Sequence, residues 1–517
     1  MTTVTTDPTS APDLSEYADQ QQSPLCRLPR QLRDQIYEYY SYDEEGLEYD
    51  YAYKTLKYAS GKELDLPRTC KMVANEMKGI HLQVNAITFT PCCLEREEDS
   101  FRGLRSLSAR FEHLLHSVRW TKLLMLHYAA ELVTEEVIVR VIEACPAMSS
   151  NFRAILRNIR LGNDFWGFST ELSLSRDTFC ASFCEAVQMS LDLIADHPQF
   201  DHLISLACSK SNHYPGNRSP FRAGSHQQIL AWRPDPWLIP TVDNLTSVEA
   251  LLMPPDSESY DWPRIYSQVK FYFSATAIRI ATLGRLTTEA RKPIRSIILI
   301  ENCRAVSSPD AHAEGLIPFC TENKQLRILM QAGFTTNLVP SYWEWAILMD
   351  KTTSSRLFGD QGCYSRILVD WLMRIAALPS RGMPSGSFVV DLNARQPKAA
   401  LFWTCQECVA AKRLQLPQHL VNYDLDNPRR GPVPQPFTHT WRVPIQLAAV
   451  FKDIADGNSL IRLDILPGET WAPIHSVEEC RRFGMDEFVV LYYMRKHEFP
   501  GNLEDHFRTY LHSQHDD

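Results

Sequence analysis

The sequence predicts an α+β fold that is predominantly helical. Through residues 101–195 apolar side chains recur every three or four positions, which is the period of a helix with one buried face. From about residue 290, runs rich in β-branched residues such as 294–300 alternate with helical stretches, as expected of a buried sheet and its helices. A small helical unit precedes both regions. Because 517 residues exceed what one hydrophobic core usually supports, we expect more than one subdomain.

Composition and charge exclude several classes of protein. With 44% hydrophobic and 22% charged residues, the chain has the composition of a folded globular protein. A formal net charge of -9 leaves no overall basic surface for a phosphate backbone, so nucleic acid is not expected as a partner. No apolar stretch approaches the ~20 residues that a membrane helix needs, so we expect no membrane partner.

The first 24 residues are predicted to be a disordered tail. Thr, Ser, Pro, Gln and Asp dominate residues 1–24, and the segment has neither the basic start nor the apolar run of a signal peptide. The 14 cysteines of the chain lack the regular spacing of a disulfide scaffold, so we expect reduced thiols. These features predict a cytoplasmic or nuclear protein.

Residues 25–95 are predicted to form a small unit of two amphipathic helices and a strand. A helix that begins at Pro29 would gather a period-four apolar stripe on one face, with Tyr37 and Tyr39 beside it. The stripe consists of Leu28, Leu32, Ile36 and Tyr40. Proline suits the first turn of a helix, because its missing N–H would have no partner there and its φ is already helical. The charged residues between them, Arg30, Arg33, Asp34 and Glu38, are expected to face water.

The second helix of this unit has a shorter apolar face. Its members fall at i, i+3, i+4 and i+7, and they are Cys70, Val73, Ala74 and Met77. Ile87 and Phe89 alternate with threonines and predict a short strand. Neither helix is long enough to be stable alone, so both must bury their stripes against each other or against a partner. Residues 39–58 form a Tyr-rich acidic insert, which we interpret as a solvated loop, with a strand-like segment as the alternative.

Three segments of this unit resemble a known family. LPRQLRDQIYEYY, LDLPRTCKMVANEM and NAITF are similar to the F-box-like domain of a large group of filamentous-fungal proteins, over roughly residues 25 to 90. In F-box proteins the Leu-Pro start and the helix after it contact a Skp-type adaptor, which links the protein to a cullin-RING ubiquitin ligase. The resemblance implies a partner-binding role for Leu28, Pro29, Leu32, Ile36 and Tyr37. Residues 295–328 also resemble the C-terminal region of these proteins, to which no chemistry is assigned.

The remainder of the chain divides into three regions. Residues 96–210 are predicted to be helical, residues 211–290 an irregular and helical connection, and residues 291–517 a mixed α/β region. Expected helices include 134–144, 151–160, 175–195 and 364–377. Expected strands are 294–300, 388–392 and 488–493.

Residues that suggest chemistry are few and incomplete. Cys405 and Cys408 have the spacing of half a zinc site, but no second ligand pair lies at a suitable distance. His312 and Glu314 match the start of a deaminase signature whose second cysteine is missing after Cys320. Neither a dinucleotide-binding glycine motif nor a P-loop occurs. We therefore expect no catalytic residue, no metal site and no cofactor.

Three hypotheses follow for the function. In the first, the chain is a non-enzymatic protein–protein interaction protein that docks on a Skp-type adaptor and recognises an unknown protein substrate for a ubiquitin ligase. In the second, it is a stand-alone scaffold whose F-box-like motif is only internal core. In the third, the C-terminal half is an unrecognised hydrolase or metal enzyme that uses His312, Glu314 or the Cys405 and Cys408 pair.

Overall fold

A seven-stranded mixed sheet organises the computed structural model, and helices complete an α+β fold. The structure describes residues 23–94, 106–148, 180–209, 221–252, 270–333, 361–393 and 446–463, with gaps at 223 and 304 and three further residues between 152 and 156. The strands are β1 (Leu47–Asp50), β2 (Thr55–Tyr58), β3 (Ala86–Phe89), β4 (Ser296–Glu301), β5 (Arg327–Gly333), β6 (Phe388–Asn393) and β7 (Ile461–Leu463). The predicted α+β class is confirmed.

The sheet has the order β2-β1-β3-β4-β5-β6-β7. Strands β1 and β2 form an antiparallel hairpin, and every later pairing is parallel. From β3 onward each strand lies beside the next one in the chain. The predicted strands at 87–89, 294–300 and 388–392 are confirmed, whereas the one expected at 488–493 lies outside the described residues.

Buried side chains form continuous rows across the sheet because the strands are in register. One row runs through Leu47, Ile87, Ile297, Ile328 and Phe388, and the next runs through Phe89, Leu299, Met330, Val390 and Ile461. All of these side chains are buried in the main core. Their neighbours along each strand are less buried, as the period of two along a strand requires.

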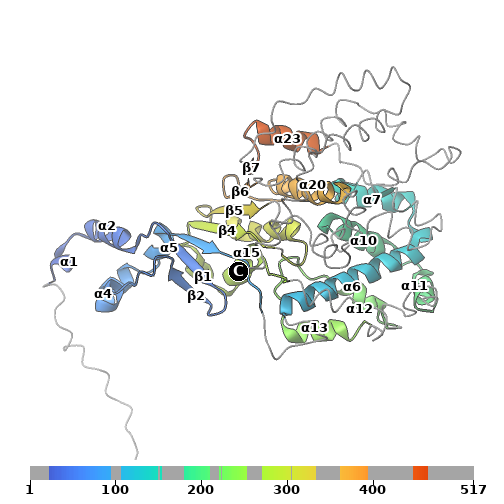
Figure 1. Cartoon of the computed structure of the whole chain (residues 1–517), viewed down its shortest axis with the longest axis horizontal. Helices are drawn as coiled ribbons and strands as arrows, with labels where there is room; N and C mark the ends of the chain where they lie inside the picture. The colour runs from blue at the N-terminus through green and yellow to red at the C-terminus, as the bar shows by residue number, and fades with distance from the viewer. Residues whose placement is uncertain are drawn as a thin grey trace, which may run out of the picture.

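The helical region lies beyond one end of the sheet. It contains α6 (Leu107–Tyr128), α7 (Glu135–Ala144), α10 (Ala181–Ile194), α11 (Phe200–Ser209), α12 (His226–Ala231) and α13 (Val242–Glu249). In Figure 1 these helices lie on one side of the strands, and the N-terminal helices lie on the other. Thr134 caps α7 by accepting a hydrogen bond from the Val137 N–H, as predicted. Most of the helix expected at 151–160 lies outside the described residues.

Further helices are interspersed with the later strands. They are α15 (Ala275–Arg285), α16 (Thr288–Arg291), the 3-10 helix η8 (Pro309–Leu316), α17 (Ile317–Glu322), α20 (Gln361–Ala377) and α23 (Leu447–Ala455). Two short 3-10 helices, η4 (Ala130–Leu132) and η5 (Pro146–Met148), flank α7. None of the described helices is both long and apolar enough to span a bilayer.

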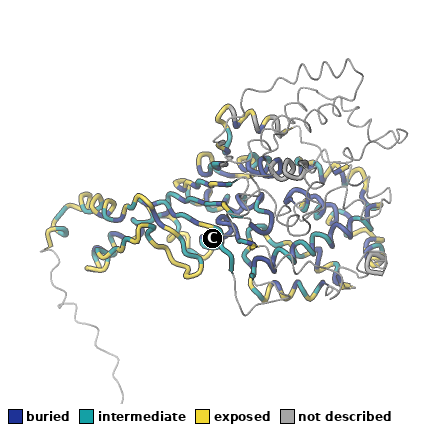
Figure 2. Tube along the Cα trace, in the orientation of Figure 1, coloured by how far each residue is buried: buried dark blue, intermediate teal, exposed yellow. Residues whose placement is uncertain are grey.

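The N-terminal segment contributes both helices and strands. Its helices are α1 (Pro24–Arg27), α2 (Arg30–Ser41), α3 (Leu66–Thr69), α4 (Lys71–Glu76) and α5 (Ile80–Val84). They enclose a second, small core built from Tyr37, Val73, Met77 and Ile80. Figure 2 shows that exposed and half-buried residues dominate these helices, in contrast to α6 and α10, where buried residues prevail. The segment is not a purely helical unit, since β1, β2 and β3 belong to the large sheet.

The Tyr-rich insert is a hairpin, which corrects the interpretation as a solvated loop. Strands β1 and β2 pair along their whole length, from Leu47 opposite Tyr58 to Asp50 opposite Thr55. The rings of Tyr49 and Phe89 pack with their centroids 5.0 Å apart. This aromatic contact anchors the hairpin on β3, because aromatic pairs at such distances add to the stability gained by burial.

Gly46 precedes β1 and Gly61 follows β2, and we expect alanine at these two positions to destabilise the protein to different extents. Gly46 and Gly61 both have positive φ, but a Cβ at Gly46 would lie 2.6 Å from the Ala86 carbonyl oxygen, and one at Gly61 would meet nothing within 4 Å. We expect Gly61→Ala to cost about 1 kcal/mol of backbone strain. Gly46→Ala should cost about 1 to 3 kcal/mol more, because β1 must move away from β3. Urea unfolding of both variants measures the difference, and equal losses would contradict the close approach.

Candidate docking site

Helix α2 exposes an apolar stripe that faces away from the protein. Pro29 is exposed, and the side chains of Leu32, Ile36 and Tyr39 are 46%, 39% and 85% exposed. Their spacing of three, four and three residues keeps them on one side of an α-helix. These four residues are called the outer stripe below.

The outer stripe overlaps with the predicted one but is not identical to it. Leu28 is half-buried at the turn before α2, while Leu32 and Ile36 are exposed, as a docking role requires. Tyr40 instead packs against the small core, and its hydroxyl accepts hydrogen bonds from the N–H groups of Asp65 and Leu66 at 3.0 and 3.2 Å. Tyr39 takes its place on the outer side.

Tyr37 belongs to the inner face of α2. Its side chain is 0% exposed, and its hydroxyl donates to Glu76 Oε2 at 2.9 Å. The ring is part of the small core together with Val73 and Met77. Tyr37 therefore lies behind the outer stripe, in the small core, and its side chain is not exposed at the surface.

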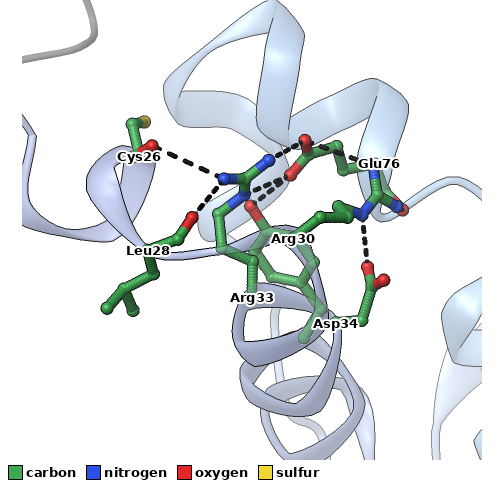
Figure 3. Close-up of polar contacts among 7 residues, drawn as sticks. Cys26, Leu28, Arg30, Arg33, Asp34 and Glu76 are labelled. Atoms are coloured by element: carbon green, nitrogen blue, oxygen red, sulfur yellow. Dashed lines mark hydrogen bonds and ion pairs between the residues drawn. The ribbon is translucent and has the colours of Figure 1, made fainter.

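Arg33 also lies on the inner face, so the expectation that it faces water is wrong. Its side chain is 12% exposed, and it forms a bidentate pair with Glu76 of α4: Nη2 lies 2.6 Å from Oε1 and Nε lies 2.9 Å from Oε2. Arg33 and Tyr37 are one helical turn apart and meet the same carboxylate (Figure 3). Their four-residue spacing was the signal in the sequence that both share a face.

The remaining guanidinium nitrogen of Arg33 reaches the turn before α2. Nη1 donates to the Leu28 carbonyl at 2.6 Å and to the Cys26 carbonyl at 3.5 Å. Cys26 lies in the last turn of the four-residue helix α1, and Leu28 directly follows the helix. Carbonyl groups at such a helix end lack partners within the helix. One side chain thereby connects α1, α2 and α4, as Figure 3 shows.

The charges around Glu76 favour its ionised form. The hydrogen bonds from Arg33 lower the pKa of Glu76 to about 2, and the hydrogen bond from Tyr37 and the positive charge of Arg30 act in the same direction. Burial, and then the hydrogen bond to Glu76, raise the pKa of Tyr37 to about 12, so its hydroxyl remains a donor. The result is a charge-assisted cluster in which every partner has the protonation state that it needs.

The other residues singled out in the sequence do not converge on a site. His312 is buried; its Nδ1 lies 2.6 Å from Ser274 Oγ and its Nε2 lies 3.1 Å from the Ser307 carbonyl oxygen. Burial lowers the pKa of His312 to about 4. Glu314 is paired with Arg374 and Arg381 at 2.6 and 2.5 Å. His312 therefore connects η8 to the start of α15, and Glu314 connects it to α20.

No metal centre is found in the part of the chain that the structure describes. Within those residues, no three His, Cys, Asp or Glu side chains are arranged to hold an ion. Cys405 and Cys408 lie outside the described residues.

Comparison with known proteins adds no relative. No family model matches the chain, and neither a curated protein nor a solved structure matches it.

The charge state of Glu76 predicts how the stability of the N-terminal unit depends on pH. The pKa of Glu76 is about 2 in the folded protein, compared with its ordinary value of 4.5 in the unfolded chain. The stability that the ionised Glu76 contributes to the fold is therefore complete above pH 4.5 and is lost as the pH falls towards 2. We expect Glu76→Gln to lower the melting temperature at neutral pH, and the difference from wild type to shrink progressively on acidification.

Melting curves followed by circular dichroism across this pH range measure the effect. Glu38→Gln is the matched control, because Glu38 is an exposed glutamate on the neighbouring helix α2. If the melting temperature of Glu76→Gln stays below that of wild type by the same amount as the pH is lowered, the charge of Glu76 is not what stabilises the unit.

Proposed function

We propose that this protein is a non-enzymatic F-box-like interaction protein that docks on a Skp-type adaptor through the outer stripe of α2. The rest of the α+β body would then present an unknown protein substrate to a cullin-RING ubiquitin ligase. The observation that carries the proposal is the exposure of Leu32 and Ile36 on a helix whose opposite face carries the fully buried Tyr37.

Helix geometry supports this assignment. Single exposed apolar residues are ordinary at a protein surface. Three in line along one twelve-residue helix form the kind of ridge that an amphipathic helix inserts into an apolar groove of a partner, and here they are Leu32, Ile36 and Tyr39. Pro29 and Leu28 precede this ridge directly, in the order of the F-box-like motif.

The two alternative hypotheses have weaker support. If the stripe were internal core, Leu32 and Ile36 would be enclosed, yet both are more than one third exposed. If His312 and Glu314 were catalytic, they would face a common site, yet His312 contacts Ser274 at the start of α15 and Glu314 pairs with Arg374 of α20. Nine cysteines are free thiols in the structure, which supports a reducing compartment such as the cytoplasm or nucleus.

Acidic substitutions in the outer stripe test the proposal. Leu32→Asp and Ile36→Asp should each weaken binding to a purified Skp-type adaptor roughly tenfold or more, because each places a carboxylate in an apolar contact. Both sites are exposed, so the melting temperature should be nearly unchanged. Isothermal titration calorimetry of the full chain with the adaptor gives the dissociation constants.

A matched control comes from another helix. Val139 on α7 is 40% exposed, similar to Leu32 and Ile36, and Val139→Asp should bind the adaptor like wild type. If wild type does not bind, or if all three variants bind equally well, the docking function is refuted. If Leu32→Asp and Ile36→Asp unfold while Val139→Asp remains folded, the scaffold hypothesis is favoured.

A further inference from the structure

The start of the outer stripe depends on polar contacts for its position. Helix α1 has only four residues and buries none of them. Leu28 and Pro29 are both extended, with ψ values of 147° and 148°, so two non-helical residues separate α1 from α2. Leu25 is the only residue of α1 that packs, in part, against the small core of the described unit. Apolar packing therefore constrains this turn weakly.

Arg33 supplies the missing constraint. Its Nη1 group holds the Leu28 carbonyl at 2.6 Å, while the two other nitrogens of the same planar group hold Glu76 at 2.6 and 2.9 Å. Because the guanidinium is rigid, the position of the Leu28 carbonyl is set by the position of α4. Glu76 in turn orients the guanidinium (Figure 3).

We propose that Arg33 is a positioning residue for the docking face: it fixes Leu28 and Pro29 against α2, so that they join Leu32 and Ile36 in one preformed surface. This inference rests on the proposed docking function. A turn that is already ordered binds more tightly, because its ordering entropy is not lost on association. Arg33 itself stays behind the surface and does not touch the partner.

The neighbouring arginine shows why the role is specific to Arg33. Arg30 also pairs with Glu76, at 3.2 Å, and with Asp34, at 2.6 Å. Its side chain is 49% exposed, and the structure gives it no hydrogen bond to Leu28 or Cys26. Arg30→Gln therefore removes the same charge from the same helix and leaves the contact with the turn intact.

Two variants of Arg33 separate positioning from charge. Arg33→Lys keeps a positive charge beside Glu76 but lacks the planar fork that reaches both Glu76 and Leu28. Arg33→Gln removes the charge as well. The small core, built from Tyr37, Val73, Met77 and Ile80, does not include Arg33, so we expect both variants to remain folded.

Hydrogen exchange of the full chain, followed by mass spectrometry, measures the order of the turn directly. We expect peptides covering residues 25–32 to exchange about tenfold faster in Arg33→Lys and Arg33→Gln, and at the wild-type rate in Arg30→Gln. Peptides covering β3 and β4 should be unchanged in all three. Adaptor affinity should fall roughly tenfold in the Arg33 variants and stay within about twofold of wild type in Arg30→Gln.

The outcomes are distinguishable. Unchanged exchange of residues 25–32 in both Arg33 variants overturns the inference, and so does an acceleration that spreads across β3 and β4, because Arg33 would then be a general stabilising residue. Faster exchange with wild-type affinity shows that the turn is not part of the docking face, which also overturns it. If wild type itself does not bind the adaptor, the proposed function fails, while exchange still decides whether Arg33 orders the turn.

Discussion

The architecture depends on the parallel pairing of β3 with β4. About 200 residues of chain separate these strands, and the whole helical region lies between them in the sequence. Ile87 pairs with Ile297 and Phe89 with Leu299, so the buried rows of the sheet begin in the N-terminal segment. A shift of one residue would turn these side chains to the other face of the sheet. Burial of the rows therefore selects one register, and this register fixes where the N-terminal helices α1 to α5 are attached to the sheet.

The carboxyl end of β4 is tied to α15 by polar groups that resemble catalytic ones. The buried Glu301 accepts hydrogen bonds from the Thr276 N–H and hydroxyl at 2.8 and 2.6 Å, at the first turn of α15. Ser274 caps the same helix by accepting from the Ala277 N–H at 2.8 Å and also contacts His312. A buried polar group is costly without a partner, and here the partners are the free amides of a helix start. This explains why Ser274 and Glu301 are both buried at the start of α15, where each accepts hydrogen bonds from backbone amides of the helix.

Helix α2 has one face held against the N-terminal unit, and the outer stripe on its other side stays exposed. Tyr37 and Arg33 anchor α2 to Glu76 from the inside, and the apolar residues Val73 and Met77 close the small core around the Tyr37 ring. Because a single carboxylate receives both anchors, the position of α4 also determines the orientation of α2. The exposed side chains of Leu32 and Ile36 are then held on a helix that does not depend on them for its own packing. This separation of roles is what a preformed interaction surface requires.

Local patterns determined much of the secondary structure. The sequence alone predicted the Thr134 cap of α7, the strand at Ile87 and Phe89, and the β-branched strand β4, since each depends on neighbours within a few residues. The period-four stripe was less reliable, because four residues advance a helix by 400°, and by Tyr40 the stripe has rotated onto the inner face. Tyr39, at a spacing of three from Ile36, stays outside. Only the tertiary structure decided that Arg33 meets Glu76, that the Tyr-rich insert is a hairpin, and that β3 lies between β1 and β4. The physical reason is that these contacts join residues far apart in the chain, whose pairing depends on the burial of the whole sheet and not on any local period.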